Sequence, residues 1–179
     1  MTREPAAAMI EALATYLDGL TWTQTTTVLR GWPEQDTELD LSAGPTISVT
    51  EIDAPETAHA IQTEDPVDGS AAIAVALVEA TLQVDLWAAY REHLDVAASE
   101  LADALHNDLP YRPHLYLTAA DYHDRDFAVL VVPGARADID GDSAAVGEWR
   151  RTWTLRATIE RVVIAPTVAL VSATATLDS

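Results

Sequence analysis

The sequence predicts an α+β fold, in which an antiparallel or mixed β-sheet is covered on one face by two helices. Three observations lead to this prediction: two stretches have apolar residues at helical spacing, several others have apolar residues at every second position, and their order is helix, strands, helix, strands. Two layers are the economical packing for that order, because each helix has one apolar stripe to bury against the sheet. We expect a single domain over residues 1–166, with long loops, followed by a C-terminal extended arm or edge strand at 167–179.

The helices are expected at Pro5–Leu20 and Tyr90–Leu109. In both, apolar residues recur at spacings of three and four, and Pro5 suits the first turn of the first helix. Pro110 ends the second helix, because the residue before a proline disfavours the helical conformation.

Alternating or β-branched stretches predict the strands, at Thr21–Arg30, Thr46–Ile52, Ala71–Trp87, Phe127–Val132 and Trp149–Ile164, with a short extended piece at Leu115–Leu117. The stretch from Ala71 is interrupted at Glu79–Thr81, so it is either one long strand with a bulge or two strands joined by a tight turn. In the last strand, one set of residues faces one way (Trp153, Leu155, Ala157 and Ile159) and the alternate set faces the other (Thr152, Thr154, Arg156, Thr158 and Glu160).

Polar and acidic segments connect these elements. Residues 34–44 and 121–126 form acidic loops, 135–147 forms a polar loop, and 53–70 forms a loop or hairpin connection with room for a short strand at 58–62. The alternation returns at Val168–Thr176, which predicts the arm that reaches for a neighbour.

The charge is strongly unbalanced, with 29 Asp and Glu against 10 basic residues, all of them arginine, and a formal net charge of −19. Such a chain repels itself in dilute salt, whereas at 1 M salt the Debye length falls to about 3 Å. The composition resembles proteins of salt-in halophiles such as haloarchaea and their viruses. A GC-rich genome would explain the missing lysine but not the acid excess. The charge also argues against an open basic face for nucleic acid.

Several classes of chemistry are excluded or weakly supported by the residues. There is no cysteine, no lysine for a phosphate-binding loop, and no serine in a Gly-x-Ser-x-Gly turn. The run Asp138–Asp142 has its glycine at the wrong position for a calcium loop, and no two histidines have zinc-ligand spacing. The loop residue His123 is the one candidate base, although a polar loop histidine is the ordinary interpretation. We therefore expect no catalytic residue, no metal and no cofactor, and neither a signal peptide nor a membrane helix.

Arginines and tryptophans at the start of the last strand form a candidate subunit or partner interface. Arginine suits desolvated, bidentate contacts with carboxylates, either on this chain or across a subunit boundary. With two apolar residues of the predicted arm, the candidate interface residues are Trp149, Arg150, Arg151, Arg156, Val168 and Leu170.

The stretch Leu82–Ala88, which runs directly into the predicted second helix, resembles the tailed-phage tail terminator and tail completion proteins. The opening helix and the long arginine-containing strand Trp149–Val163 also fit that family. The resemblance implies a structural virion protein that forms a ring, usually a hexamer, at the head-proximal end of the tail tube. This ring would end tube polymerisation and join the tail to the head.

The partners that the resemblance implies are other copies of the chain, the tail tube protein and a head–tail connector protein. Double-stranded DNA would pass through the lumen without specific binding, and no membrane is involved. Assembly would take place in the host cytoplasm, and the mature location would be the tail or neck of the virion. The alternatives are a head–tail connector or stopper protein of the neck, and a small α+β binding or enzyme-like domain with His123 at its site.

Overall fold

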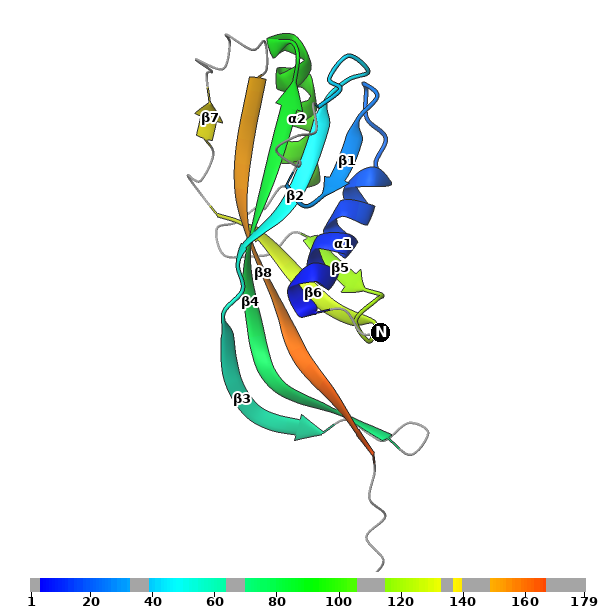
Figure 1. The fold of residues 1–179 in the computed structure, drawn as a ribbon, viewed down its shortest axis with the longest axis vertical. Coiled ribbons are helices and arrows are strands. Elements are labelled where there is room, and N and C mark those ends of the chain that lie inside the picture. The colour runs from blue at the N-terminus through cyan, green and yellow to red at the C-terminus, as the bar shows by residue number, and fades with distance from the viewer. Residues whose placement is uncertain are drawn as a thin grey trace, which may run out of the picture.

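The computed structural model of the chain describes residues 4–32, 39–63, 70–105, 115–132, 137–139 and 149–166. The elements, in chain order, are α1 (Pro5–Asp18), β1 (Thr27–Arg30), β2 (Thr46–Asp53), β3 (Glu56–Thr63), β4 (Ser70–Ala88), α2 (Arg91–Ala104), β5 (Leu115–Ala119), β6 (Arg125–Val131), β7 (Ala137–Ile139) and β8 (Trp149–Pro166) (Figure 1).

The eight described strands form one sheet with the order β1-β2-β4-β8-β6-β5, while β3 pairs with β4 and β7 with β8. Only the pair β1–β2 is parallel, so within the described residues the sheet is mixed. Two helices and a mixed sheet confirm the predicted α+β class. Neither α1 nor α2 has the length and apolar character to cross a membrane.

The long strands β4 and β8 form the centre of the sheet and pair over their whole length, from Ala88 opposite Trp149 to Ser70 opposite Pro166. β4 is therefore one continuous strand of 19 residues, about 60 Å long at the usual rise per residue. Its register against β8 shifts between Ala74 and Ala76, not at Glu79–Thr81 as the sequence indicated. The alternation continues there because Ala80, only 1% exposed, occupies the core position between two larger residues.

One side of the central strands carries the core. Alternate residues of β4 from Val78 to Ala88 and of β8 from Trp153 to Ile159 are buried in a single apolar cluster. Met9, Leu13 and Leu17 of α1 belong to this cluster, as do buried leucines and alanines of α2. The predicted inward face of the last strand is confirmed.

Both helices are found where they were predicted, with shorter bounds. α1 begins with Pro5 in its first turn and ends at Asp18, where Trp22 Nε1 donates a hydrogen bond to the carbonyl oxygen of Leu17 at 3.0 Å. α2 ends at Ala104, and the remainder of its predicted range lies outside the described residues beyond Leu105.

Three strands differ from their predicted ranges. β1 is only four residues long, because the chain before it bonds to α2 instead: the Thr23 amide and hydroxyl donate to Glu100 Oε1 at 3.1 and 2.5 Å. β3 is a full eight-residue strand paired with β4, where the sequence indicated a loop with a short strand at most. β7 lies within the predicted polar loop and pairs with β8.

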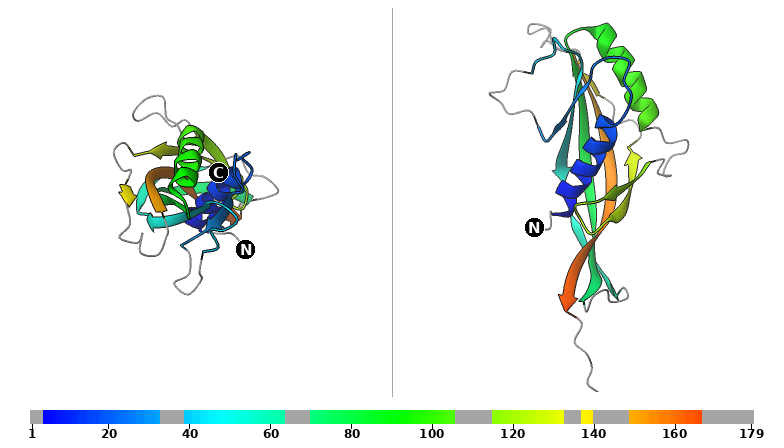
Figure 2. Two further views of the ribbon diagram at one scale, coloured as in Figure 1. Left: turned by 90° about the horizontal axis from the view of Figure 1, so that it is seen from above. Right: turned by 90° about the vertical axis from the view of Figure 1, so that its right-hand side faces the viewer.

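The lower parts of β3, β4 and β8 continue past both helices as a narrow ribbon, which Figures 1 and 2 show below the body of the molecule. We call this three-stranded extension the ribbon. Residues 167–179, and with them the predicted arm at Val168–Thr176, lie outside the described residues.

Candidate interaction surface

The alternation of β8 divides the predicted interface residues between the two sides of the sheet. Arg151, 8% exposed, lies on the side of the core and contacts α2, with its Nη2 at 3.1 Å from Asp95 Oδ1. Trp149 also packs against the core, and the guanidinium carbon of Arg91 lies 5.5 Å from the centre of its ring. These two residues therefore attach α2 to the sheet. Val168 and Leu170 lie outside the described residues.

Arg150 lies on the opposite side of the sheet, between two tryptophans. Its guanidinium carbon is 4.6 Å from the ring centres of both Trp32 and Trp87. The two indoles meet edge to face, with centroids 6.2 Å apart and an interplanar angle of 81°. A guanidinium held against two π faces gains cation–π attraction from each, and this attraction grows as water is excluded.

Asp85 of β4 anchors this cluster from within the sheet. Its side chain is fully buried, and Oδ1 accepts hydrogen bonds from Arg150 Nε at 2.9 Å and from Thr152 Oγ1 at 2.5 Å. Arg150 Nη2 also lies 2.8 Å from Oδ1, and Gln83 Nε2 donates to Oδ2 at 2.7 Å. A buried carboxylate is tolerated only when such donors and an opposite charge compensate its lost hydration.

This cluster explains the polar members of the sequence stretch that carries the family resemblance. Leu82, Val84 and Leu86 point into the core, whereas Asp85 and Trp87 point the other way and hold Arg150 of the returning strand. A fully charged residue within an otherwise apolar strand was the signal for Asp85. Trp32 had no comparable signal, because it follows a short strand far away in the sequence.

Below the cluster, the same side of the sheet is rich in threonine. Cross-strand partners place side chains from four strands on it, and we call this set the threonine face: Thr46, Ser48 and Thr50 of β2, Thr81 and Gln83 of β4, Ala128 and Leu130 of β6, and Thr152, Thr154, Arg156 and Thr158 of β8. Most of these side chains are half-buried, and Arg156 is exposed. No member of the face is acidic, although the chain has 29 acidic residues.

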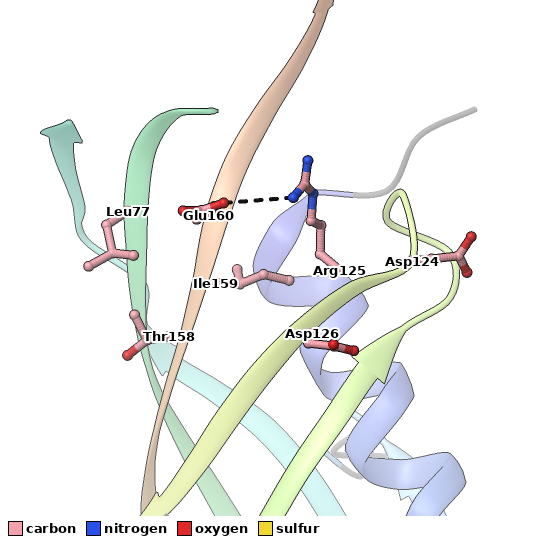
Figure 3. Close-up of a pocket in the computed structure, with 7 residues that line it drawn as sticks. All are labelled: Leu77, Asp124, Arg125, Asp126, Thr158, Ile159 and Glu160. Atoms are coloured by element: carbon pink, nitrogen blue, oxygen red, sulfur yellow. Dashed lines mark ion pairs between the residues drawn. The ribbon is translucent and has the colours of Figure 1, made fainter. Parts of the chain in front are cut away.

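A hollow marks the lower border of the threonine face, where acidic residues begin (Figure 3). It has a volume of about 390 Å³ and is lined by Leu77, Asp124, Arg125, Asp126, Thr158, Ile159 and Glu160. Arg125 Nη1 lies 3.8 Å from Glu160 Oε2 across it. The adjoining turn has positive φ at His123 and Asp124, and His123 is exposed with its ring against Tyr122.

Among the described residues, no group of three His, Asp or Glu side chains is placed to hold a metal ion. The comparisons with protein-family models and with curated proteins gave no match to this chain. The features that remain for a functional argument are the ribbon, the tryptophan–arginine cluster and the threonine face.

Proposed function

We propose that this chain is a structural virion protein of a tailed virus that forms a ring at the head-proximal end of the tail tube. The ring, expected to be a hexamer, stops tube polymerisation and joins the tail to the head connector, with DNA passing through its lumen. The observation that carries this proposal is the ribbon of β3, β4 and β8, which extends beyond the core-forming body.

The ribbon is built for contact with another molecule. The described core side chains of β4 begin at Ala76 and those of β8 end at Val162, whereas the two strands pair on as far as Ser70 and Pro166. A ribbon of two or three strands is marginally stable in water by itself. Val163 on the ribbon is 47% exposed and Ile52 at the end of β2 is 56% exposed, so neighbouring copies would bury apolar surface there.

Open strand edges support the same proposal. Among the described strands, β1 and β5 end the sheet, and β3 pairs with β4 alone. An unpaired edge presents backbone N–H and C=O groups to which another chain can add a strand. Repeated head-to-tail contacts of this kind close into a ring when the rotation between copies allows it.

The finer arrangement expected from the sequence, with both helices on one face, is part of this proposal. It is supported by the shared core cluster and by two ion pairs on the same side of β8, Arg151 with Asp95 of α2 and Arg161 with Glu4 before α1. The opposite, helix-free side then remains for partners. The net charge of −19 supports a lumen that repels DNA phosphates and lets the genome pass.

The first test is the mass of the native assembly. In molar KCl, where the charge is screened, light scattering should give a multiple of 19.3 kDa, six times for a hexamer, and electron microscopy should show annular particles. A monomer at all KCl concentrations contradicts the proposal. If that monomer melts at a higher temperature with a small-molecule ligand, it favours a binding domain.

A second test separates the terminator from the neck alternative. Virions that lack a terminator should carry tails of irregular and excessive length. Loss of a connector or stopper should instead give filled heads that leak DNA and have no tail. Particles with normal tails and normal heads would contradict both assignments.

A further inference from the structure

We propose that the threonine face binds the charge-free segment that follows β8, residues 167–177, of a neighbouring copy of this chain. The inference deepens the proposed function, since it rests on the ring to supply the neighbouring copy. It assigns the contact between successive copies to one sheet face and one segment.

The first argument is the composition of the face. It has eleven side chains from four strands, none of them acidic, in a chain where about one residue in six is Asp or Glu. Charged residues are depleted at the centre of protein interfaces, because their desolvation costs free energy that a partner must compensate. Glu79 and Glu160 lie just beyond the face, so the acid-free area has a definite border.

The second argument is the composition of the segment. Residues 162–177 contain no Asp, Glu, Arg, Lys or His, and 167–177 consists of Thr, Val, Ala, Leu and Ser alone. Such residues favour extended structure, and a charge-free extended segment is an aggregation hazard unless a partner covers it. In a chain with a net charge of −19, the segment and the face are therefore matched in their lack of acids.

The third argument is hydrogen bonding. An extended segment laid on an aliphatic face would leave its peptide groups without partners, which is costly once water is excluded. Threonine hydroxyls both donate and accept, and Gln83 and Arg156 add further donors. A face of threonine rather than valine can therefore bind a backbone as well as its side chains.

The fourth argument is where the segment begins. β8 runs downward along the threonine face from Arg150 to Thr158 and then continues to Pro166 at the tip of the ribbon. The eight residues between Thr158 and Pro166 span about 26 Å. To reach its own face, the segment would have to reverse at the tip and retrace that length, which uses most of its reach of about 36 Å. A neighbouring copy offers the face without a reversal.

The experiment uses single cysteines, which are specific because the chain has no native cysteine. Two full-length variants, Thr154→Cys on the face and Leu170→Cys on the segment, are mixed in molar KCl and treated with a short bismaleimide. Only a contact between two copies can join the two variants. Further segment positions, Val168→Cys and Ser172→Cys, cover the unknown register, and Thr21→Cys, at an exposed threonine off the face, is the control.

We expect a mixed cross-linked dimer for Thr154→Cys with at least one segment position, and none above background for Thr21→Cys. Adding Arg156→Glu to the face variant should lower the yield about tenfold, whereas Thr21→Glu in its place should leave it unchanged. The inference is overturned if rings form but no segment position cross-links to Thr154→Cys, or if Arg156→Glu has no effect. It is also overturned if only a chain that carries both cysteines reacts, within itself. In contrast, a full-length chain that is monomeric by light scattering would overturn the proposed function.

Discussion

Replacement of Arg150 by methionine should destabilise the protein strongly, because it leaves a buried carboxylate without its cation. Asp85 has no exposed surface and depends on Arg150 for both its countercharge and its strongest hydrogen bonds, at 2.9 and 2.8 Å. Breaking a buried ion pair by removal of one partner typically costs about 3–5 kcal/mol. The lost stacking between Trp32 and Trp87 adds to the cost.

Removal of the other partner should cost less. Arg150 is 19% exposed, so its guanidinium can still reach water when Asp85 is changed to asparagine, and the new amide oxygen can still accept from Thr152. We expect Asp85→Asn to cost about 1–3 kcal/mol, the usual range for one weakened buried polar contact. The double variant should cost less than the sum of the two single changes, because the pair acts as a unit.

The assay is urea unfolding at a fixed molar KCl concentration, with the melting temperature as a second readout. For a chain of this length, the expected loss for Arg150→Met corresponds to a decrease in melting temperature of about 10 °C. Arg91→Met is the matched control, because Arg91 also lies beside a tryptophan and an aspartate but is 67% exposed and 3.9 Å from Asp95 Oδ2. It should change stability by about 0.5 kcal/mol or less. Equal effects of the two arginine changes would refute the reasoning from burial.

Three further changes test local features. Tyr122→Phe removes the hydroxyl that accepts the Val162 amide at 2.9 Å, close to the register shift between β4 and β8, so it should cost about 1–2 kcal/mol and speed hydrogen exchange at that amide. Gly44→Ala should cost about 1–3 kcal/mol or more in urea unfolding, because Gly44 has a φ of +144° and a Cβ there would overlap the carbonyl oxygen of Thr25. Ser42→Ala should raise the pKa of Asp40, measured by NMR titration, because hydrogen bonds from the Ser42 hydroxyl and amide hold that pKa below its usual value. The stability contribution from Asp40 is present above its unfolded pKa and is lost as the pH falls through the lowered folded value.

Each of these has a matched control. Tyr116→Phe changes a tyrosine that is 68% exposed and should leave exchange at Val162 unchanged. Gly31→Ala meets no atom within 4 Å, so only the strain of its φ of +96° remains, and a cost as large as that of Gly44→Ala would contradict the steric explanation. An Asp40 pKa that stays low in Ser42→Ala would show that the two hydrogen bonds are not its cause.

Local pattern was sufficient where a side chain's environment depends on its own element. The helical spacing from Ile10 to Leu20 and the alternation from Trp153 to Ile159 both predicted buried faces, because helices and strands expose their side chains with fixed periods. The same logic failed at Ala80, where a small residue at a core position resembled an interruption. It also missed β3, whose pairing with β4 depends on a partner ten or more residues away.

The sequence by itself determined the fold class, the side of the last strand that enters the core, and the acidity of the whole chain. Only the tertiary structure decided which of the neighbouring arginines would be buried against a helix and which would be held between two tryptophans. The physical reason is that successive residues of a strand point to opposite sides of the sheet, so their partners come from different elements. Arg151 meets Asp95 of α2, and Arg150 meets Asp85 of β4, 65 residues earlier in the chain.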